Sequence, residues 1–99
     1  MALFSLYCLD NETDGAVRRA AARADHLAWA RAAGDIVRMA GPLLGEDGET
    51  MLGSNFIIQA DDLAAAKAFH AEDPYVKAGV FGQVFIRETK WSIGTGAPE

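Results

Sequence analysis

Residues 2–9 read Ala-Leu-Phe-Ser-Leu-Tyr-Cys-Leu, an apolar run that ends at the turn-forming pair Asp10-Asn11. Aromatic and aliphatic residues in a short run before a turn predict a β-strand. Successive side chains of a strand point to opposite faces. One face therefore carries Phe4, Leu6 and Cys8, and the other carries Leu3, Ser5, Tyr7 and Leu9. Both faces are largely apolar, whereas a strand with one wet face alternates polar and apolar residues. We therefore expect a sheet that is covered on both sides.

Three further strands and two main helices are predicted along the rest of the chain, from apolar runs and helix-forming stretches bounded by Gly, Pro and Asp. The first predicted helix spans residues 16–33 and is stopped by Gly34. The second runs from residue 61 or 62 to about 71 and is capped by Asp61 or Asp62. A short helical turn at 73–77 is begun by Pro74. The predicted strands are residues 35–44, 50–60 and 79–91. Residues 92–99 are expected to form a flexible tail.

The predicted order is βαββαβ, the order of the α+β ferredoxin-like fold with its four-stranded antiparallel sheet, in a single domain over residues 1–99. Two helices can cover only one face of such a sheet. The predicted fourth strand is again apolar on both faces, with Val80, Val84 and Ile86 opposing Phe81, Phe85 and Trp91. An open apolar face of this size exceeds what monomers usually expose. We therefore expect a homodimer in which two sheets pack face to face as a dimeric α+β barrel.

Composition and charge exclude several classes of protein. Of the 99 residues, 51% are hydrophobic and 23% charged, which is the balance of a folded globular protein. The net charge of −5 disfavours binding to nucleic acid or to an anionic membrane. Cys8 is the single cysteine, so no intrachain disulfide can form, which fits a reducing compartment. Because residues 1–4 carry no basic side chain and no apolar run is long enough to cross a bilayer, we expect a cytoplasmic protein.

Two residues stand out among the few that can do acid–base chemistry near neutral pH. His26 lies among small apolar residues of the first predicted helix, where it could simply occupy a helix edge and stack on Trp29. This alanine-rich helix does not reveal which of its sectors is buried. Asp73 precedes Pro74 and can cap the turn that follows. A capping carboxylate can also accept the N–H of an imidazole and make that ring a better base.

The other candidate groups have simpler explanations. His70 has Glu72 and Asp73 nearby, and we expect it to be solvated at the surface. Two histidines without a Cys/His cluster argue against a metal site. Cys8 on an apolar strand is expected to be a small buried hydrophobe. The glycines match no phosphate loop, dinucleotide fingerprint or nucleophile elbow, so we expect neither a cofactor nor a metal.

Five fragments occur in an order and spacing that resemble the YCII-related (YciI-like) proteins. They are Arg23-Ala-Asp-His-Leu27, Ala40-Gly-Pro-Leu43, Gly53-Ser54, Asp73-Pro-Tyr-Val76 and Gly79-Val-Phe81. The resemblance runs from the first predicted strand through the fourth. It implies a dimeric α+β barrel built from ferredoxin-like units, in agreement with the two-faced strands. Relatives of this superfamily include muconolactone isomerase and a dehydrochlorinase that acts on chlorinated hydroxyquinones, and many members have no known substrate.

The resemblance also implies a site. The proposed catalytic pair of the family is a His–Asp dyad, which corresponds here to His26 and Asp73. The residues implied near the pocket are Arg23, Gly41, Pro42 and Ser54. We expect that pocket between the sheet and the helices, lined by the aromatic residues Phe56, Tyr75 and Phe81.

Two functions from different classes fit these features. The first is a small-molecule lyase or isomerase with His26 as general base, while Arg23 or Ser54 holds a carboxylate or phenolate of the substrate. The second is a non-catalytic ligand-binding or regulatory dimer, with a metabolite in the same pocket and no proton transfer. A third reading is that the motifs only build the fold, because Gly41-Pro42 and Asp73-Pro74 are explained by turn chemistry. Turnover that depends on His26 would distinguish the first from the others.

Overall fold

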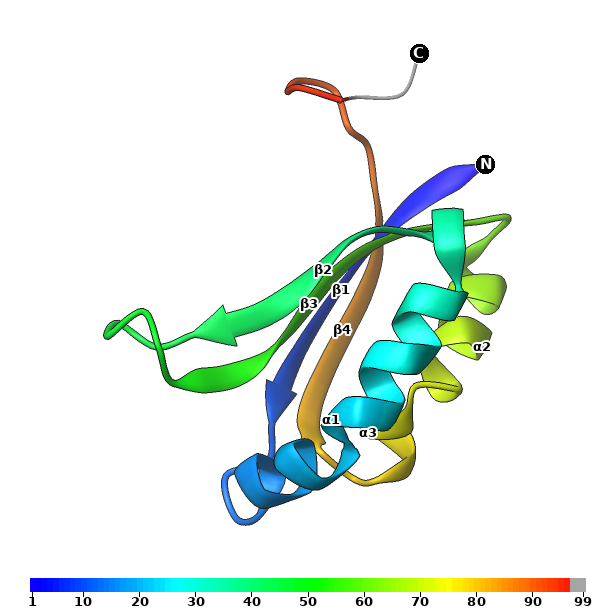
Figure 1. The fold of residues 1–99 in the computed structure, drawn as a ribbon. Coiled ribbons are helices and arrows are strands. Elements are labelled where there is room, and N and C mark those ends of the chain that lie inside the picture. The colour runs from blue at the N-terminus through cyan, green and yellow to red at the C-terminus, as the bar shows by residue number, and fades with distance from the viewer. Residues whose placement is uncertain (97–99) are drawn as a thin grey trace.

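A computed structural model describes residues 1–96 and has the predicted order of elements (Figure 1). The strands are β1 (Ala2–Asp10), β2 (Val37–Leu44), β3 (Met51–Ala60) and β4 (Phe81–Thr89). The helices are α1 (Gly15–Ala32), α2 (Leu63–Ala71) and α3 (Pro74–Lys77), and a 3₁₀ turn spans Gly34–Ile36. All strand pairs are antiparallel and the sheet order is β2-β3-β1-β4. The predicted α+β class and four-stranded antiparallel sheet are confirmed.

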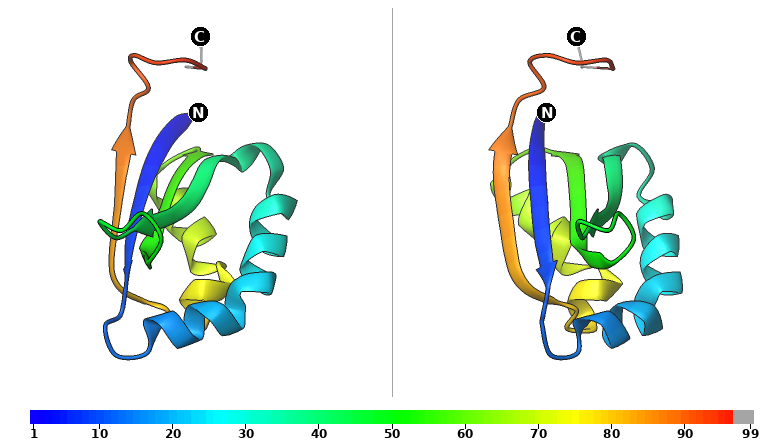
Figure 2. Two further views of the ribbon diagram at one scale, coloured as in Figure 1. Left: turned by 60° about the vertical axis from the view of Figure 1, so that its left-hand side comes forward. Right: turned by 90° about the vertical axis from the view of Figure 1, so that its left-hand side faces the viewer.

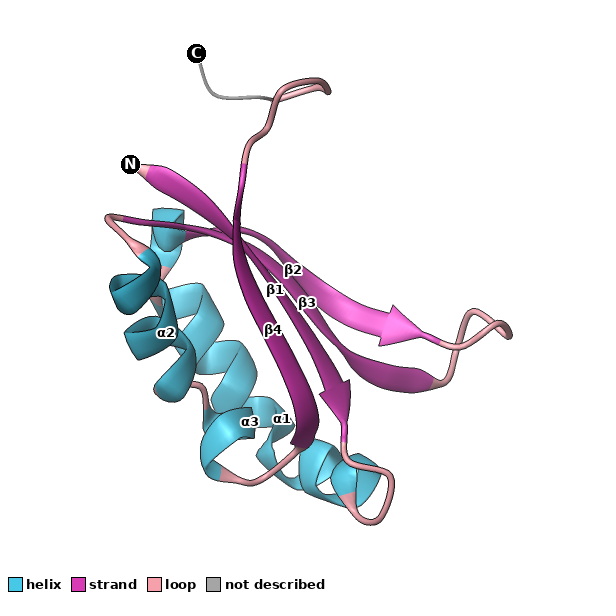
Figure 3. Cartoon of the chain, turned by 180° about the vertical axis from the view of Figure 1, so that it is seen from behind, coloured by secondary structure: helices cyan, strands magenta, loops and turns pink. Residues whose placement is uncertain are grey.

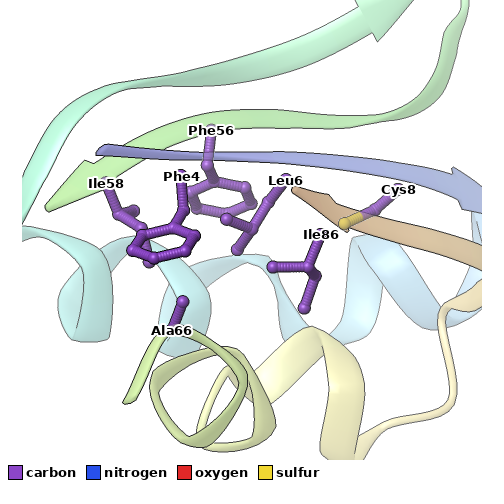
Figure 4. Close-up of a cluster of buried hydrophobic side chains, with 7 residues drawn as sticks. All are labelled: Phe4, Leu6, Cys8, Phe56, Ile58, Ala66 and Ile86. Carbon is purple, nitrogen blue, oxygen red and sulfur yellow. The ribbon is translucent and has the colours of Figure 1, made fainter. Parts of the chain in front are cut away.

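All three helices lie on one face of the sheet, as two further views show (Figure 2). Side-chain caps set where two of them begin. The Asp62 carboxylate accepts the Ala65 N–H at 2.8 Å, and Pro74 follows the capping Asp73 at the start of α3. The core fills the space between helices and sheet (Figure 4). Its fully or nearly fully buried members are Phe4, Leu6, Cys8, Phe56, Ile58, Ala66 and Ile86. The inward face of β1 is therefore the one that carries Phe4, Leu6 and Cys8.

The opposite face of the sheet is covered by no helix in the described part of the chain, as the view from behind also shows (Figure 3). Tyr7 pairs directly with Phe85 across β1 and β4. Their exposed fractions are 44% and 46%, and Met39 on β2 is exposed to a similar degree. We call Tyr7, Phe85 and Met39, with the neighbouring Ile57, the outer apolar face. It is the open apolar face that the strand pattern predicts.

The largest differences from the predicted boundaries are at β2, at β4 and in the tail. Strand β2 begins at Val37 because the chain turns at Gly34, whose φ of +61° suits glycine, and then forms the short 3₁₀ turn. Strand β4 spans Phe81–Thr89 and leaves out Val80, whose N–H donates instead to the Tyr75 carbonyl. Of the predicted tail, residues 92–96 bend back beside Trp91, and residues 97–99 lie outside the described residues.

The prediction that Phe81 shares a face with Phe85 is wrong. The pairing of β1 with β4 shifts register between Leu9 and Asp10, so that Leu9 pairs with Gln83 but Asp10 pairs with Phe81. Such a bulge adds a residue to one strand and turns the following side chain to the other face. Phe81 therefore packs against both core clusters on the helix side, while Phe85 faces away from the helices.

Candidate functional site

The buried stripe of helix α1 decides which of its side chains reach the interior. Its buried residues are Gly15, Arg19, Ala22 and His26, spaced three or four apart and therefore on one face of the helix. Val17 lies on the solvent side and is 74% exposed. Two of the four buried positions are thus polar residues, and both must find partners inside the protein.

His26 finds its partner in Asp73, at the start of α3. Nδ1 of His26 lies 2.7 Å from Oδ1 of Asp73, and the carboxylate is completely buried. The same Oδ1 accepts the backbone N–H of Tyr75 at 2.9 Å, so Asp73 is also the helix cap that its position before Pro74 predicts. A carboxylate accepts hydrogen bonds, so neutral His26 carries its proton on Nδ1 and leaves Nε2 free to take another.

Aromatic rings hold the imidazole in place. The ring of His26 stacks on that of Tyr75, with centroids 3.8 Å apart and planes within 9°. Phe56 meets His26 edge-on at 5.9 Å, and Trp29 lies 6.0 Å away at a tilt. The expected neighbour Trp29 is therefore present, but the closest ring is Tyr75. These contacts leave the imidazole one orientation, with Nδ1 toward Asp73.

A cavity of about 100 Å³ lies beside this pair, between α1 and the β2–β3 side of the sheet. Its polar lining residues are Arg19, Arg23, His26 and Ser54, and its apolar ones are Leu27, Ala30, Ala40, Gly41, Pro42, Met51, Phe56 and Tyr75. Most of the predicted site residues belong to this wall. They are Arg23, His26, Gly41, Pro42, Ser54, Phe56 and Tyr75. Phe81 does not, and packs edge-on against Tyr75 instead.

Arg19 also lines the cavity, and sequence reasoning missed it together with its partner Asp10. Nε and Nη2 of Arg19 donate to the two carboxylate oxygens of Asp10 at 2.8 and 2.7 Å. Nη2 also donates to Oγ of Ser54 at 2.9 Å. Burial opposes the charge of Arg19, but the hydrogen bonds and charge of Asp10 outweigh it and raise the pKa of Arg19. One signal in the sequence could have identified Arg19. It lies seven residues before His26, and this spacing places both side chains on one face of a helix.

His70 is buried, so the prediction that it is solvated at the surface is wrong. It lies on the buried face of α2 and stacks on Phe81 with centroids 6.0 Å apart. Burial lowers the pKa of His70, against the opposing influence of the Asp73 charge. His70 is therefore a neutral core histidine, and it is not part of the cavity wall.

Cys8 lies in the core, as its strand pattern predicts. Burial, followed by the negative charge of Asp73, raises the pKa of the Cys8 thiol to about 12. The thiolate is the reactive form of cysteine, so Cys8 is not a nucleophile near neutral pH.

Within residues 1–96, no three side chains of His, Cys, Asp or Glu come close enough together to hold a metal ion. No helix in this part of the chain is both long and apolar enough to cross a membrane.

Comparison with known proteins shows a family, a relative and a solved structure that this chain resembles. A model of the YCII-related domain matches residues 2–90. An uncharacterised protein of Haemophilus influenzae is 38% identical over 80 residues, which are 74% of this chain and 82% of that protein. The solved structure of 5-chloro-2-hydroxyhydroquinone dehydrochlorinase (TftG) from Burkholderia phenoliruptrix AC1100, in complex with 2,5-dihydroxybenzoquinone, superposes with a TM-score of 0.77. That enzyme is 28% identical, and the match covers 97% of this chain and 99% of the other.

Proposed function

Because the chain belongs to the YCII-related family, we propose that it is a small-molecule lyase or isomerase in which His26 is the general base and Asp73 orients it. The observation that supports this role is the 2.7 Å contact between Nδ1 of His26 and Oδ1 of Asp73, at the wall of a cavity. The similarity to a dehydrochlorinase supports the lyase class. A small cavity with mostly apolar walls and a few polar groups is typical of a small-molecule site.

The proposed reaction begins with proton transfer to Nε2 of His26. The proton comes from a carbon or hydroxyl of the substrate, and the electron pair of the broken bond moves into the substrate. In an elimination, that pair forms a new double bond while a leaving group departs with its own bonding pair. In an isomerisation, His26 returns the proton to another carbon. The Asp73 carboxylate stabilises the imidazolium formed in the first step, without itself taking the proton.

The charge of Asp73 is therefore expected to contribute more to turnover than its hydrogen bonds do. Asparagine at position 73 can keep an oxygen at Oδ1 for both the His26 and Tyr75 donors, but it carries no charge. We expect Asp73→Asn to lower turnover by about 10²-fold or more, within the range for general acid–base catalysis. The measurement is a steady-state assay on a panel of chlorinated hydroxyhydroquinones and muconolactone-type lactones.

Asp25→Asn is the matched control, because Asp25 is an exposed aspartate directly before His26 on α1. It should leave turnover unchanged. Equal turnover by Asp73→Asn and the wild type would contradict the role of Asp73. Ligands that raise the melting temperature without any product, in wild type and His26→Ala alike, would instead establish a non-catalytic binding module.

We further propose that two copies associate through the outer apolar face. In a two-fold dimer the same patch meets itself, and Tyr7 and Phe85 lie side by side on this face. Phe85→Glu places a charge there and is expected to convert the dimer to monomer in analytical ultracentrifugation. The control is Val17→Glu, a similar change at an exposed site on α1 that should leave the dimer intact. A wild-type protein that sediments as a monomer at all concentrations would reject this assembly.

A further inference from the structure

Two buried polar atoms at the dyad and its neighbour on α2 have no hydrogen-bond partner among the described residues. They are Oδ2 of Asp73 and Nδ1 of His70. Asp73 is fully buried, and its contacts with His26 and with the Tyr75 N–H both use Oδ1. Buried polar atoms in folded proteins nearly always bond to protein groups or to ordered water. Each of these two atoms therefore needs a partner that the dyad itself does not supply.

The backbone holds His70 and Asp73 together where α2 is followed by α3. The backbone N–H of Asp73 donates to the carbonyl of His70 at 3.0 Å. Burial lowers the pKa of His70, and the negative charge of Asp73 opposes that shift, so the carboxylate is near enough to act on the imidazole. The chain has two histidines, His26 and His70. Both are therefore neighbours of the same buried carboxylate.

Aromatic contacts fix the ring of His70 as they fix that of His26. His70 stacks on Phe81 with ring centroids 6.0 Å apart, and Phe81 meets Tyr75 edge-on at a centroid distance of 6.0 Å. Tyr75 in turn stacks on His26. The two imidazoles and the two rings between them form one packed series, and neither His70 nor Phe81 lines the cavity. His70 is thus placed to act on Asp73 without touching a ligand in the cavity.

We propose that a buried water molecule bridges Nδ1 of His70 and Oδ2 of Asp73, and that His70 is thereby a positioning residue for the His26–Asp73 pair. This inference rests on the proposed function of that pair. Neutral His70 carries one ring proton, which on Nδ1 is donated to the water oxygen. The water then donates one of its own hydrogens to Oδ2. Buried waters that join otherwise unpaired polar groups are a regular part of protein structures.

The bridge holds the orientation of the Asp73 carboxylate. If the carboxylate turns about its Cβ–Cγ bond, Oδ1 moves away from Nδ1 of His26 and from the Tyr75 N–H. A donor on Oδ2 opposes this rotation and also stabilises the negative charge. Outer partners that orient a functional group commonly change activity by roughly 10–100-fold. We therefore expect His70→Leu to lower kcat by about tenfold and to leave KM unchanged, because the cavity wall is intact.

A crystal structure of the wild-type protein, at a resolution that shows ordered water, tests the bridge directly. We expect one water molecule within hydrogen-bonding distance of both Nδ1 of His70 and Oδ2 of Asp73. A site without water density, or a direct contact between the two side chains, would overturn the proposal. This measurement needs no substrate, so its outcome is separate from that of the proposed function.

Two variants of His70 separate positioning from packing. His70→Leu removes Nδ1, whereas the amide nitrogen of His70→Asn lies near the same place and can still donate to the water. In proton NMR, we expect the Nδ1 proton of His26 to exchange with solvent about tenfold faster in His70→Leu, the effect of losing one hydrogen bond to a charged group. His70→Asn should restore exchange close to the wild-type rate.

Lys67→Leu is the matched control, because Lys67 is exposed on the same helix, and it should leave the exchange rate unchanged. Equal exchange in His70→Leu and the wild type would contradict the positioning role. Equal acceleration in both His70 variants would also contradict it, since packing alone would then explain the effect. If His70→Leu does not fold, the crystal structure decides. A bridging water in a protein that shows no turnover would reject the general-base role of His26 alone.

Discussion

Replacing His26 by asparagine is expected to lower turnover by about 10²–10⁴-fold, the range attributed to a positioned general base. The asparagine amide nitrogen occupies nearly the position of Nδ1 and can still donate to Oδ1 of Asp73. The variant therefore keeps the contact with Oδ1 of the buried carboxylate while it removes Nε2, the atom assigned to accept the substrate proton. The measurement is kcat and KM on any substrate found in the panel, with circular dichroism to verify folding.

His26→Gln is the informative companion to this variant. Glutamine places an amide group near the position of Nε2 but has no donor near Nδ1, so Asp73 loses a hydrogen-bond partner while fully buried. We expect His26→Gln to lose turnover and also stability, because an unpaired buried charge is costly. Asp25→Asn again serves as the control, since Asp25 is exposed and does not line the cavity. A His26→Asn protein that retains full turnover would show that His26 is not the base.

The largest expected effect on stability is that of Gly53→Ala. Gly53 lies in β3 and pairs with Leu9 of β1, and these are the two inner strands of the sheet. A Cβ at this position would collide with the backbone carbonyl oxygen of Cys8, and it would come within 3.2 Å of Leu43 Cδ1. A backbone atom of a central strand cannot rotate away as a flexible side chain can. The added methyl group must therefore separate β1 from β3.

We expect Gly53→Ala to reduce the free energy of unfolding by about 3 kcal/mol, at the upper end of the usual range for overpacking. This is a large fraction of the 5–15 kcal/mol that typically separates folded from unfolded protein. Urea unfolding followed by circular dichroism measures it. The matched control is Gly41→Ala on neighbouring β2, where a Cβ has no neighbour within 4 Å. If both variants unfold at the same urea concentration, the close approach of β1 to Gly53 does not require a glycine for stability.

Local chemistry explains why much of this fold was predictable. Apolar runs define the four strands and the alanine-rich stretch defines α1. The cap of α2 forms at Asp62, one of the two predicted candidates, and that of α3 forms at Asp73 as expected. These features depend on residues close together in sequence, so their pattern is visible there. The positions of His70 and Phe81 were mispredicted because both depend on distant contacts. His70 is buried against the sheet side, and Phe81 changes face at a bulge where β4 pairs with β1.

The sequence by itself determined the βαββαβ order, the apolar outer side of the sheet and the choice of His26 and Asp73 as candidates. Only the tertiary structure decided that the two side chains meet at 2.7 Å, and that Arg19, Asp10 and Ser54 join beside them. The reason is physical: helix α1 is alanine-rich, so hydrophobic patterning does not orient it. The buried face of α1 is set by what the sheet and α3 present to it, and those partners come from residues 9 to 47 positions away in the chain.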